Sequence, residues 1–347
     1  MPQPTESWFR RSATRRAVTV PAVAAGSAAL GLTAGVWAPV ATAWDLARSG
    51  TRLPRLRLLS FAWAWTTLET IGVVASGALW LTGQADDRDA HYALQRWWAA
   101  RLVDSLGVLA NLHIEVDDLG ALAPGPIVMA ARHSSIADSL LPAWLLGRIG
   151  MRPRYVLKDD LLIDPCLDIV GNRLPNHFVD RAPDDNATEL ELLEALAQRM
   201  DRADAAVVFP EGMVVTEARR AAAMARIAER DPERARRLDA LQVLAPVRAG
   251  GTAALLRGAP TADLVIVTHL GLDALRRVGD ATRQLPLTEP LRVFVRRIPR
   301  REVPEGDAFP GWFDAQWERA DRELSARAAR GAAPRPSVAA GSRRTRS

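Results

Sequence analysis

The chain has 347 residues, of which 48% are hydrophobic, so it can bury the core of one or two domains. The net charge of +5 suits an anionic partner. A nucleic-acid recognition motif and an aromatic-basic surface pattern are both absent from the sequence, so nucleic acid is not predicted as a partner. Cys166 is the single cysteine, which excludes an intrachain disulfide. The histidines and this cysteine show no metal-ligand spacing, so neither a metal nor another cofactor is predicted.

Two long apolar stretches dominate the N-terminal quarter of the chain. Residues 17–44 contain no charged residue, and residues 58–82 contain one, Glu69. About 20 apolar residues suffice to cross a bilayer, and the tryptophans near the ends of both stretches are typical of a membrane interface. We therefore expect a basic arm over residues 1–16 and a membrane-associated helical hairpin, spanning or re-entrant, over residues 17–84. A carboxylate within such a stretch is costly, which suggests a function for Glu69, as a contact either with another helix or with a lipid head group.

Two other interpretations of this region stay open. Thr14-Arg15-Arg16 before an apolar run, with Ala41-Thr42-Ala43 after it, is also the pattern of an export signal. Two long apolar helices can also form a buried hairpin in a soluble protein. Four arginines lie on each side of the first stretch, so the charge of its flanks does not fix an orientation in a membrane.

Short apolar runs alternate with helical patterns from residue 85 onward. Strands are predicted at residues 112–116, 127–131, around 155, 205–209, 264–268 and 291–296. Helices are predicted at residues 92–109, 140–145, 188–200, 224–241 and 312–324. This alternation predicts an α/β domain over residues 85–330, with helices on a largely buried sheet. The small, basic and proline-containing residues 331–347 predict a disordered tail.

The junction after the run at 127–131 is the best candidate for chemistry. On one continuous helix His133 and Asp138 would lie about 140° apart, but a strand–turn–helix junction allows them to meet. An aspartate there orients a histidine and stabilises its protonated form, as a general base requires. The residues also fit a helix cap at Ser134, Ser135 or Asp138 beside an incidental histidine. The local sequence does not decide between the two interpretations.

The remaining residues with reactive side chains have weaker patterns. Ser134 and Ser135 lack the Gly-x-Ser-x-Gly turn of a nucleophilic serine, so we expect them to act in a cap or turn. His113, on a predicted strand, and His269, at the end of another, are expected to be structural, and His91 is expected at the surface.

Four further motifs follow His133 in order. The segment 155–162 contains Lys158, which is the one lysine of the sequence, and residues 177–181 read His-Phe-Val-Asp-Arg. Residues 209–212 read Phe-Pro-Glu-Gly, and residues 243–248 contain a proline within an apolar run. Together with His-x4-Asp these motifs resemble those of the glycerolipid acyltransferases, whose best-known members acylate lysophosphatidic acid. The resemblance covers roughly residues 97–324.

This resemblance implies a membrane-associated O-acyltransferase with a glycerolipid-acyltransferase-type α/β sheet. The donor would be acyl-CoA or acyl carrier protein, the acceptor lysophosphatidic acid, and membrane lipids would be further partners. The expected location is the cell membrane, with the catalytic domain facing the cytoplasm. The resemblance makes His133 and Asp138 the catalytic pair, and it assigns substrate binding to Lys158, Phe178, Arg181, Glu211 and Gly212.

Two departures from the family pattern affect the choice of acceptor. Arg132 precedes the histidine where the family usually has asparagine, and Met213-Val214 follow Gly212 where threonine and arginine are usual. Arg132, Arg219 and Arg220 are candidates to replace the missing arginine. Another lysophospholipid or polar-lipid acceptor therefore stays possible. A catalytically silent lipid-binding membrane protein is the alternative from a different class.

Overall fold

The computed structural model describes residues 12–135, 137–179, 186–212, 215–272 and 282–332. Its centre is a seven-stranded sheet with the order β1-β7-β6-β2-β5-β3-β4, in which β6 and β7 are antiparallel and the other neighbours are parallel. The strands are β1 (Ile114–Val116), β2 (Ile127–Ala131), β3 (Arg152–Lys158), β4 (His177–Val179), β5 (Asp204–Val208), β6 (Asp263–Leu270) and β7 (Leu291–Ile298). Together with its flanking helices, this sheet confirms the predicted α/β fold.

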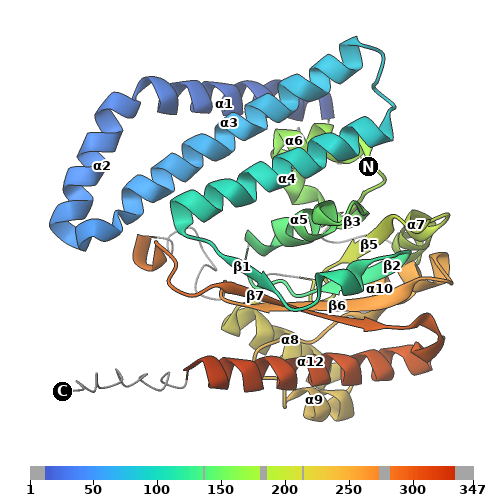
Figure 1. Ribbon diagram of the computed structural model, residues 1–347. Helices are drawn as coiled ribbons and strands as arrows, with labels where there is room; N and C mark the ends of the chain where they lie inside the picture. The colour runs from blue at the N-terminus through green and yellow to red at the C-terminus, as the bar shows by residue number, and fades with distance from the viewer. Residues whose placement is uncertain (1–11, 136, 180–185, 213–214, 273–281, 333–347) are drawn as a thin grey trace, which may run out of the picture.

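The two central strands explain why this sheet is covered on both faces. Every residue of β2 and β5 is buried, as expected for parallel strands between two helical layers. Successive side chains of β2 alternate between the layers, since Val128 and Ala130 pack into one core and Ile127 and Met129 into the other. The second core is covered by α4 (Arg88–Ala110) and α5 (Leu141–Arg148). The first is covered by α7 (Asn186–Ala197), α10 (Ala249–Gly258) and α12 (Ala308–Ala332) (Figure 1).

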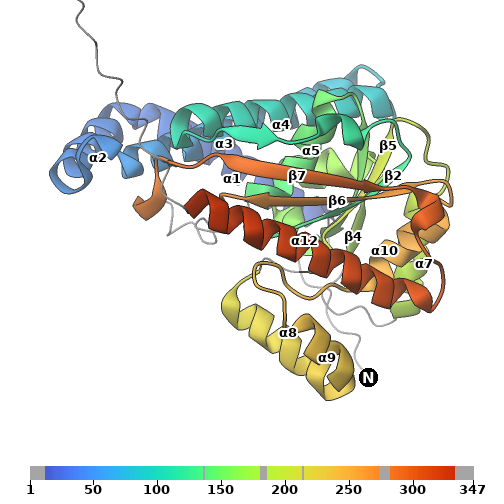
Figure 2. The ribbon, with the colours of Figure 1, turned by 60° about the horizontal axis from the view of Figure 1, so that its bottom comes forward.

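Two shorter helices, α8 (Glu217–Arg230) and α9 (Pro232–Leu238), lie on the α12 side of the sheet (Figure 2). The sequence predicted a single helix over 224–241. The chain breaks at residue 231, because the Asp231 side chain accepts the backbone N–H of Arg234 as the cap of α9 and Pro232 occupies its first turn. Arg234 then pairs with Asp314 at 2.7 Å, which fixes α9 to α12.

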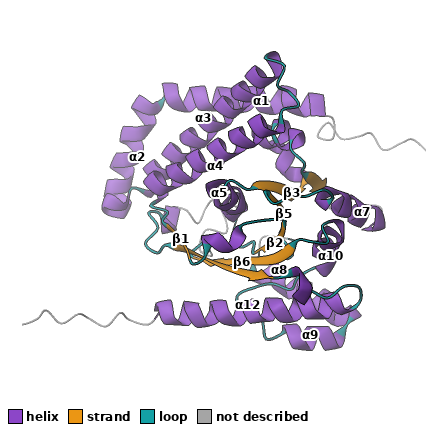
Figure 3. Ribbon diagram, turned by 45° about the vertical axis from the view of Figure 1, so that its right-hand side comes forward, coloured by secondary structure: helices purple, strands orange, loops and turns teal. Residues whose placement is uncertain are grey.

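Three N-terminal helices form a further layer above α4 and the short helix α6 (Pro165–Ile169) (Figures 1 and 3). They are α1 (Ser12–Leu32), α2 (Ala34–Ser49) and α3 (Pro54–Leu81). By length and composition α3 is able to cross a membrane, with a mean hydropathy of 1.3 over its best 18 residues. The first apolar stretch is bent by 69° between α1 and α2, so it forms at most a broken span. Residues 1–11 of the expected basic arm and residues 333–347 of the expected tail lie outside the described residues.

Buried polar contacts join this N-terminal layer to the rest of the molecule. The guanidinium of Arg15 makes two hydrogen bonds of 2.8 Å to the carboxylate of Asp168, and both side chains are buried. The carboxylate of Glu69 accepts hydrogen bonds from Trp98 Nε1 at 2.8 Å and from the backbone N–H of Cys166 at 3.3 Å. Glu69 is therefore a contact between α3 and the helices beneath it.

The same three helices also expose many large apolar side chains. Most of the large apolar side chains that the described residues expose belong to α1–α3: Val18, Leu32, Val36, Val40, Trp44, Leu46, Trp63, Trp65, Ile71, Val74, Trp80 and Leu81. Exposed apolar side chains that gather on neighbouring helices in this way are typical of a surface that contacts a membrane or another protein. We refer to these twelve residues as the apolar face.

Candidate active site

His133 follows the carboxyl end of β2, and Asp138 lies in the 3-10 turn η4 (Ala137–Leu140) that leads into α5. The turn brings the two side chains together, with His133 Nδ1 2.7 Å from Asp138 Oδ1. The imidazole lies against the ring of Phe209, with 4.8 Å between centroids, and its side chain is 16% exposed. With its Nδ1–H donated to Asp138, the ring has Nε2 as its proton acceptor.

The carboxylate of Asp138 is buried but well stabilised. Its second oxygen, Oδ2, accepts the backbone N–H groups of Ser134 and Ser135. Burial acts to raise the pKa of Asp138, but the hydrogen bonds from His133 and His269 outweigh burial and hold that pKa well below its ordinary value. Asp138 is therefore ionised at neutral pH and can stabilise a positive charge on His133.

Glu211 links the histidine to two other parts of the chain. Its Oε2 accepts the backbone N–H of His133 at 2.7 Å, and its Oε1 accepts the backbone N–H of Ala245 at 2.9 Å. Burial raises the pKa of Glu211 to about 7, even though these N–H groups and the charge of Arg132 favour the ionised form. Both oxygens accept protein hydrogen bonds, and the substrate contact predicted for Glu211 stays a prediction.

Gly212 forms the turn that follows, and its φ of +70° is a conformation that glycine adopts without strain. The side chain of Arg248 passes over this turn: a Cβ placed on Gly212 would lie 3.5 Å from Arg248 Nε. The backbone N–H of Arg248 donates to Pro210, which holds the residue beside the loop. Arg248 is not among the arginines predicted from the sequence to replace the missing one, because it lies far along the chain from Gly212.

The three arginines proposed as replacements have different surroundings. Arg132 is 1% exposed, and its Nη1 donates to the carbonyl of His269. Arg220 donates its Nη1 to the carbonyl of Gln242 at 2.8 Å. Arg219 is exposed at the start of α8. Arg132 is therefore enclosed in the protein and does not face a ligand in solution.

The other predicted substrate residues lie on neighbouring strands. Lys158 is exposed at the end of β3 and pairs in register with Val179 of β4. Phe178 of β4 is half-buried, and its ring packs against Gly171. The ends of β2, β3 and β4 share one edge of the sheet, but no described side-chain contact joins Lys158 or Phe178 to His133 or Asp138. Arg181 lies outside the described residues.

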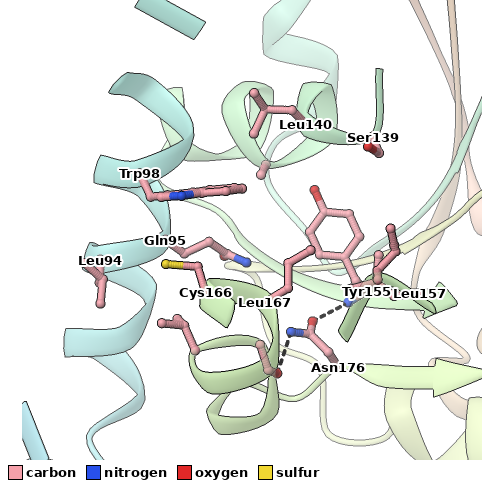
Figure 4. Close-up of a pocket in the computed structure, with 14 residues that line it drawn as sticks. Leu94, Gln95, Trp98, Ser139, Leu140, Tyr155, Leu157, Cys166, Leu167 and Asn176 are labelled. Carbon is pink, nitrogen blue, oxygen red and sulfur yellow. Dashed lines mark hydrogen bonds between the residues drawn. The ribbon is translucent and has the colours of Figure 1, made fainter. Parts of the chain in front are cut away.

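A mainly apolar cavity of about 110 Å³ lies between α4, α5, β3 and α6. Ser139, the neighbour of Asp138, is part of its wall, and Figure 4 shows the ring of Tyr155 between Ser139 and Leu167. Trp98 and Cys166, which both contact Glu69 of α3, also line the cavity. The remaining lining residues are Leu94, Gln95, Leu140, Ala143, Leu157, Leu161, Val170, Gly171 and Asn176.

A histidine–aspartate pair at the end of a parallel strand, with an apolar cavity beside it, defines a site for general-base chemistry on a substrate with an apolar part. Among the described residues, no group of three or more His, Cys, Asp or Glu is placed to hold a metal ion. Residues 113–250 match the family model described as Acyltransferase. This match makes residues 113–250 an acyltransferase domain.

The comparison with solved structures found the crystal structure of the 1-acyl-sn-glycerophosphate (LPA) acyltransferase PlsC from Thermotoga maritima. The two chains are 14% identical, and the alignment covers 79% of this chain and 98% of that one, with a TM-score of 0.47. No curated protein sequence matches this chain.

Proposed function

We propose that this protein transfers a fatty acyl group from acyl-CoA or acyl carrier protein to the free hydroxyl of lysophosphatidic acid at a membrane surface. The observation that carries the proposal is the His133–Asp138 pair, in which a 2.7 Å contact holds Nδ1 and leaves Nε2 as the proton acceptor. An acyl thioester is already activated, so this pair is sufficient for a direct transfer and an enzyme nucleophile is not required.

The reaction begins when the acceptor hydroxyl attacks the carbonyl carbon of the thioester. Nε2 of His133 takes the hydroxyl proton, and Asp138 stabilises the resulting imidazolium. The new carbon–oxygen bond forms, the carbon–sulfur bond breaks, and the thiolate leaves. His133 then returns its proton to the thiolate, which restores the base for the next turnover.

Lys158 and Arg248 are the residues that we assign to the acceptor's phosphate. Neighbouring strands lie ~4.8 Å apart, so the ends of β3 and β2, with β5 between them, are separated by roughly 10 Å. A lysine side chain is long enough to reach across much of that distance. Arg248 lies over the Gly212 turn, which follows β5, the strand between β2 and β3. In this proposal Arg248 takes the place of the arginine that the third motif lacks.

The apolar cavity is our candidate for the fatty acyl chain. Its wall begins at Ser139, one residue from Asp138, and continues through leucines, Tyr155 and Trp98 toward α6. This position would allow the thioester carbonyl to lie at His133 while the chain enters the cavity. Because Glu69 contacts Trp98 and Cys166, the N-terminal layer supports the cavity wall.

The apolar face supports a location at a membrane. Buried Arg15 and Glu69 fix the layer to the domain, while the same helices expose tryptophans, valines and leucines. We propose that α1–α3 lie in one leaflet with the apolar face toward the acyl chains, as amphipathic helices do. The cytoplasmic side of the cell membrane is the side on which the donor would be available.

The test is an assay of purified full-length protein with radiolabelled acyl-CoA against lysophosphatidic acid and a panel of other lysophospholipids. We expect labelled phosphatidic acid as the main product. Labelling of a different lysolipid would indicate that this lipid, and not lysophosphatidic acid, is the acceptor. Lipid binding without transfer to any acceptor, from either acyl-CoA or acyl carrier protein, would contradict the proposed reaction.

A further inference from the structure

A second histidine, His269, lies against the catalytic aspartate. His269 belongs to β6, which is the neighbour of β2 in the sheet, and it is 1% exposed. Its Nε2 lies 3.2 Å from Oδ2 of Asp138. The contact has the distance of an ion pair without the alignment of an ideal hydrogen bond, and neither ring nitrogen has an aligned partner among the described residues. The ring is thus a buried polar group directed at Asp138.

Asp138 already has three donors. His133 contacts Oδ1, and the backbone N–H groups of Ser134 and Ser135 donate to Oδ2. His269 is a fourth polar group against the same carboxylate, and its Nε2 lies 3.2 Å from the oxygen that does not bind His133. A carboxylate spreads its negative charge over both oxygens, so a donor to Oδ2 reduces the charge that remains on Oδ1 for His133.

Several charged and titratable groups surround His269 and Asp138. Near the contact between His269 and Asp138 lie Arg132 and His133, which follow β2, and Glu211, which follows β5. The Arg132 guanidinium donates to the carbonyl of His269, which places a fixed positive charge beside it, and on the other side β7 pairs His269 with the apolar Val293.

We propose that His269 is a positioning residue which donates its Nε2–H to Asp138 and thereby limits the basicity of His133. This inference rests on the proposed function, in which His133 is the base. The role differs from that of a catalytic residue, because His269 acts on the reaction through Asp138. The structural role expected for His269 from the sequence is therefore incomplete.

Two neutral substitutions of similar size separate this role from simple packing. The amide nitrogen of glutamine occupies nearly the position of a histidine Nε2, so His269→Gln keeps the donor to Asp138. The amide of asparagine is shorter and occupies the position of Nδ1, so His269→Asn removes the donor. His113→Gln serves as a control, because His113 is exposed and contacts the carbonyl of Asn111.

The first measurement requires no substrate. NMR spectra of the full-length protein with labelled histidine rings contain five signals, one for each histidine. The signal of His133 is identified by its loss in His133→Ala. We expect the midpoint of the His133 titration to rise by about one pH unit in His269→Asn and to stay near the wild-type value in His269→Gln and His113→Gln.

The second measurement is the pH dependence of kcat. A base must be unprotonated to act, so a higher midpoint shifts the acidic limb of the kcat profile to higher pH. At pH values below the wild-type midpoint, the kcat of His269→Asn should be roughly 10-fold lower than that of the wild type. The KM for acyl-CoA should not change. Equal midpoints in the asparagine variant and wild type, or equal shifts in the asparagine and glutamine variants, would overturn the inference. A wild-type protein that transfers no acyl group would instead contradict the proposed function, since the titration does not depend on turnover.

Discussion

Oε2 of Glu211 accepts the backbone N–H of His133 at 2.7 Å, so a carboxylate from the loop after β5 fixes the main chain that carries the base. The other oxygen, Oε1, holds Ala245 in the segment before α10. Val215 adds a third connection, because its backbone N–H donates to the carbonyl of His133. Three segments that are distant in sequence thus meet at the catalytic turn.

Glu211→Gln should reduce turnover without changing the KM of either substrate. One atom of the amide is a donor, so one of the two backbone N–H groups at His133 and Ala245 loses its acceptor. A buried group without a partner costs about 1–3 kcal/mol, and we expect the free energy of unfolding to fall by that amount. Steady-state kinetics and chemical denaturation measure the two effects. A KM effect with unchanged kcat would instead favour the direct substrate contact predicted from the sequence.

The difference in stability between wild type and Glu211→Gln should depend on pH. Burial raises the pKa of Glu211 to about 7, above its ordinary value of 4.5, so the folded protein binds this proton more tightly than the unfolded chain. The stability from this proton is complete below pH 4.5 and is lost as the pH rises through 7, by about 3 kcal/mol in total. The free energy of unfolding of Glu211→Gln relative to the wild type, measured by denaturation, should therefore be higher at pH 8 than at pH 5. An equal difference at both values would contradict a raised pKa of Glu211.

Lys158→Met and Arg248→Met should each raise the KM for lysophosphatidic acid far more than that for acyl-CoA. A hydrogen bond to a charged group contributes ~1.5–3 kcal/mol, which corresponds to a roughly 10- to 150-fold weaker interaction. Lys158→Arg should restore binding in part, because the guanidinium is wider than the ammonium group. If both residues hold one phosphate, the double variant should be non-additive.

Arg226→Met is the control for these two variants, since Arg226 is exposed on α8 and donates to the carbonyl of Ala222 within its own helix. It loses the same charge and should leave both KM values unchanged. If Arg226→Met raises the acceptor KM as much as Arg248→Met does, general surface charge explains the effect. An unchanged acceptor KM in Lys158→Met would indicate that Lys158 is a solvated surface residue and does not bind the phosphate.

The reactivity of the Cys166 thiol should show whether α3 packs against α6. A Cβ on Gly72 would lie 2.3 Å from Cys166 Sγ, so the two residues are in close contact. Burial, with Glu69 and Asp164 nearby, raises the pKa of the thiol, which keeps it unreactive. Gly72→Leu should displace α3 and increase the rate of iodoacetamide labelling at least ~10-fold, while Gly77→Leu, with open space around its Cα, should not. Fast labelling of the wild-type protein would contradict this packing.

The apolar face should govern membrane binding. Val36→Glu and Val40→Glu place charges on α2, where the two valines are 69% and 63% exposed, and we expect them to reduce sedimentation with lipid vesicles. Val108→Glu is the matched control, because Val108 is 77% exposed but belongs to α4. Wild-type protein should stay with the vesicles in high salt. Equal loss of binding in the control, or release of the wild type by salt, would contradict the assignment of the apolar face.

The central strands and the turn that joins His133 to Asp138 could be predicted from the sequence. Residues 127–131 and 205–209 are short, bounded apolar runs, and this pattern is sufficient for a buried parallel strand. His133 and Asp138 are joined by a local turn, so sequence distance was a fair guide to their contact. By contrast, β4 has three half-buried residues and no clear alternation, which is why residues 177–179 gave no strand signal.

Contacts that depend on the order of the strands could not be predicted from the sequence. His269 reaches Asp138 because β6 neighbours β2, and a single sequence does not contain the order of the sheet. His91 was expected at the surface, which is wrong: it is 0% exposed, and its Nδ1 lies 2.7 Å from the carbonyl of Asp87. Similarly, the apolar composition of α3 predicted a membrane helix but did not decide whether Glu69 contacts another helix or a lipid head group.

The most direct test of the account is acyl transfer by His133→Ala, with Asp138→Asn beside it, in purified full-length protein. We expect a fall in kcat of ~10²–10⁴-fold in His133→Ala, the usual contribution of a general base, and a smaller but still severe fall in Asp138→Asn. Fold and vesicle binding should match the wild type, since His133 is partly exposed and lies far in sequence from α1–α3. Near-normal turnover in a folded His133→Ala protein would contradict the claim that His133 is the base.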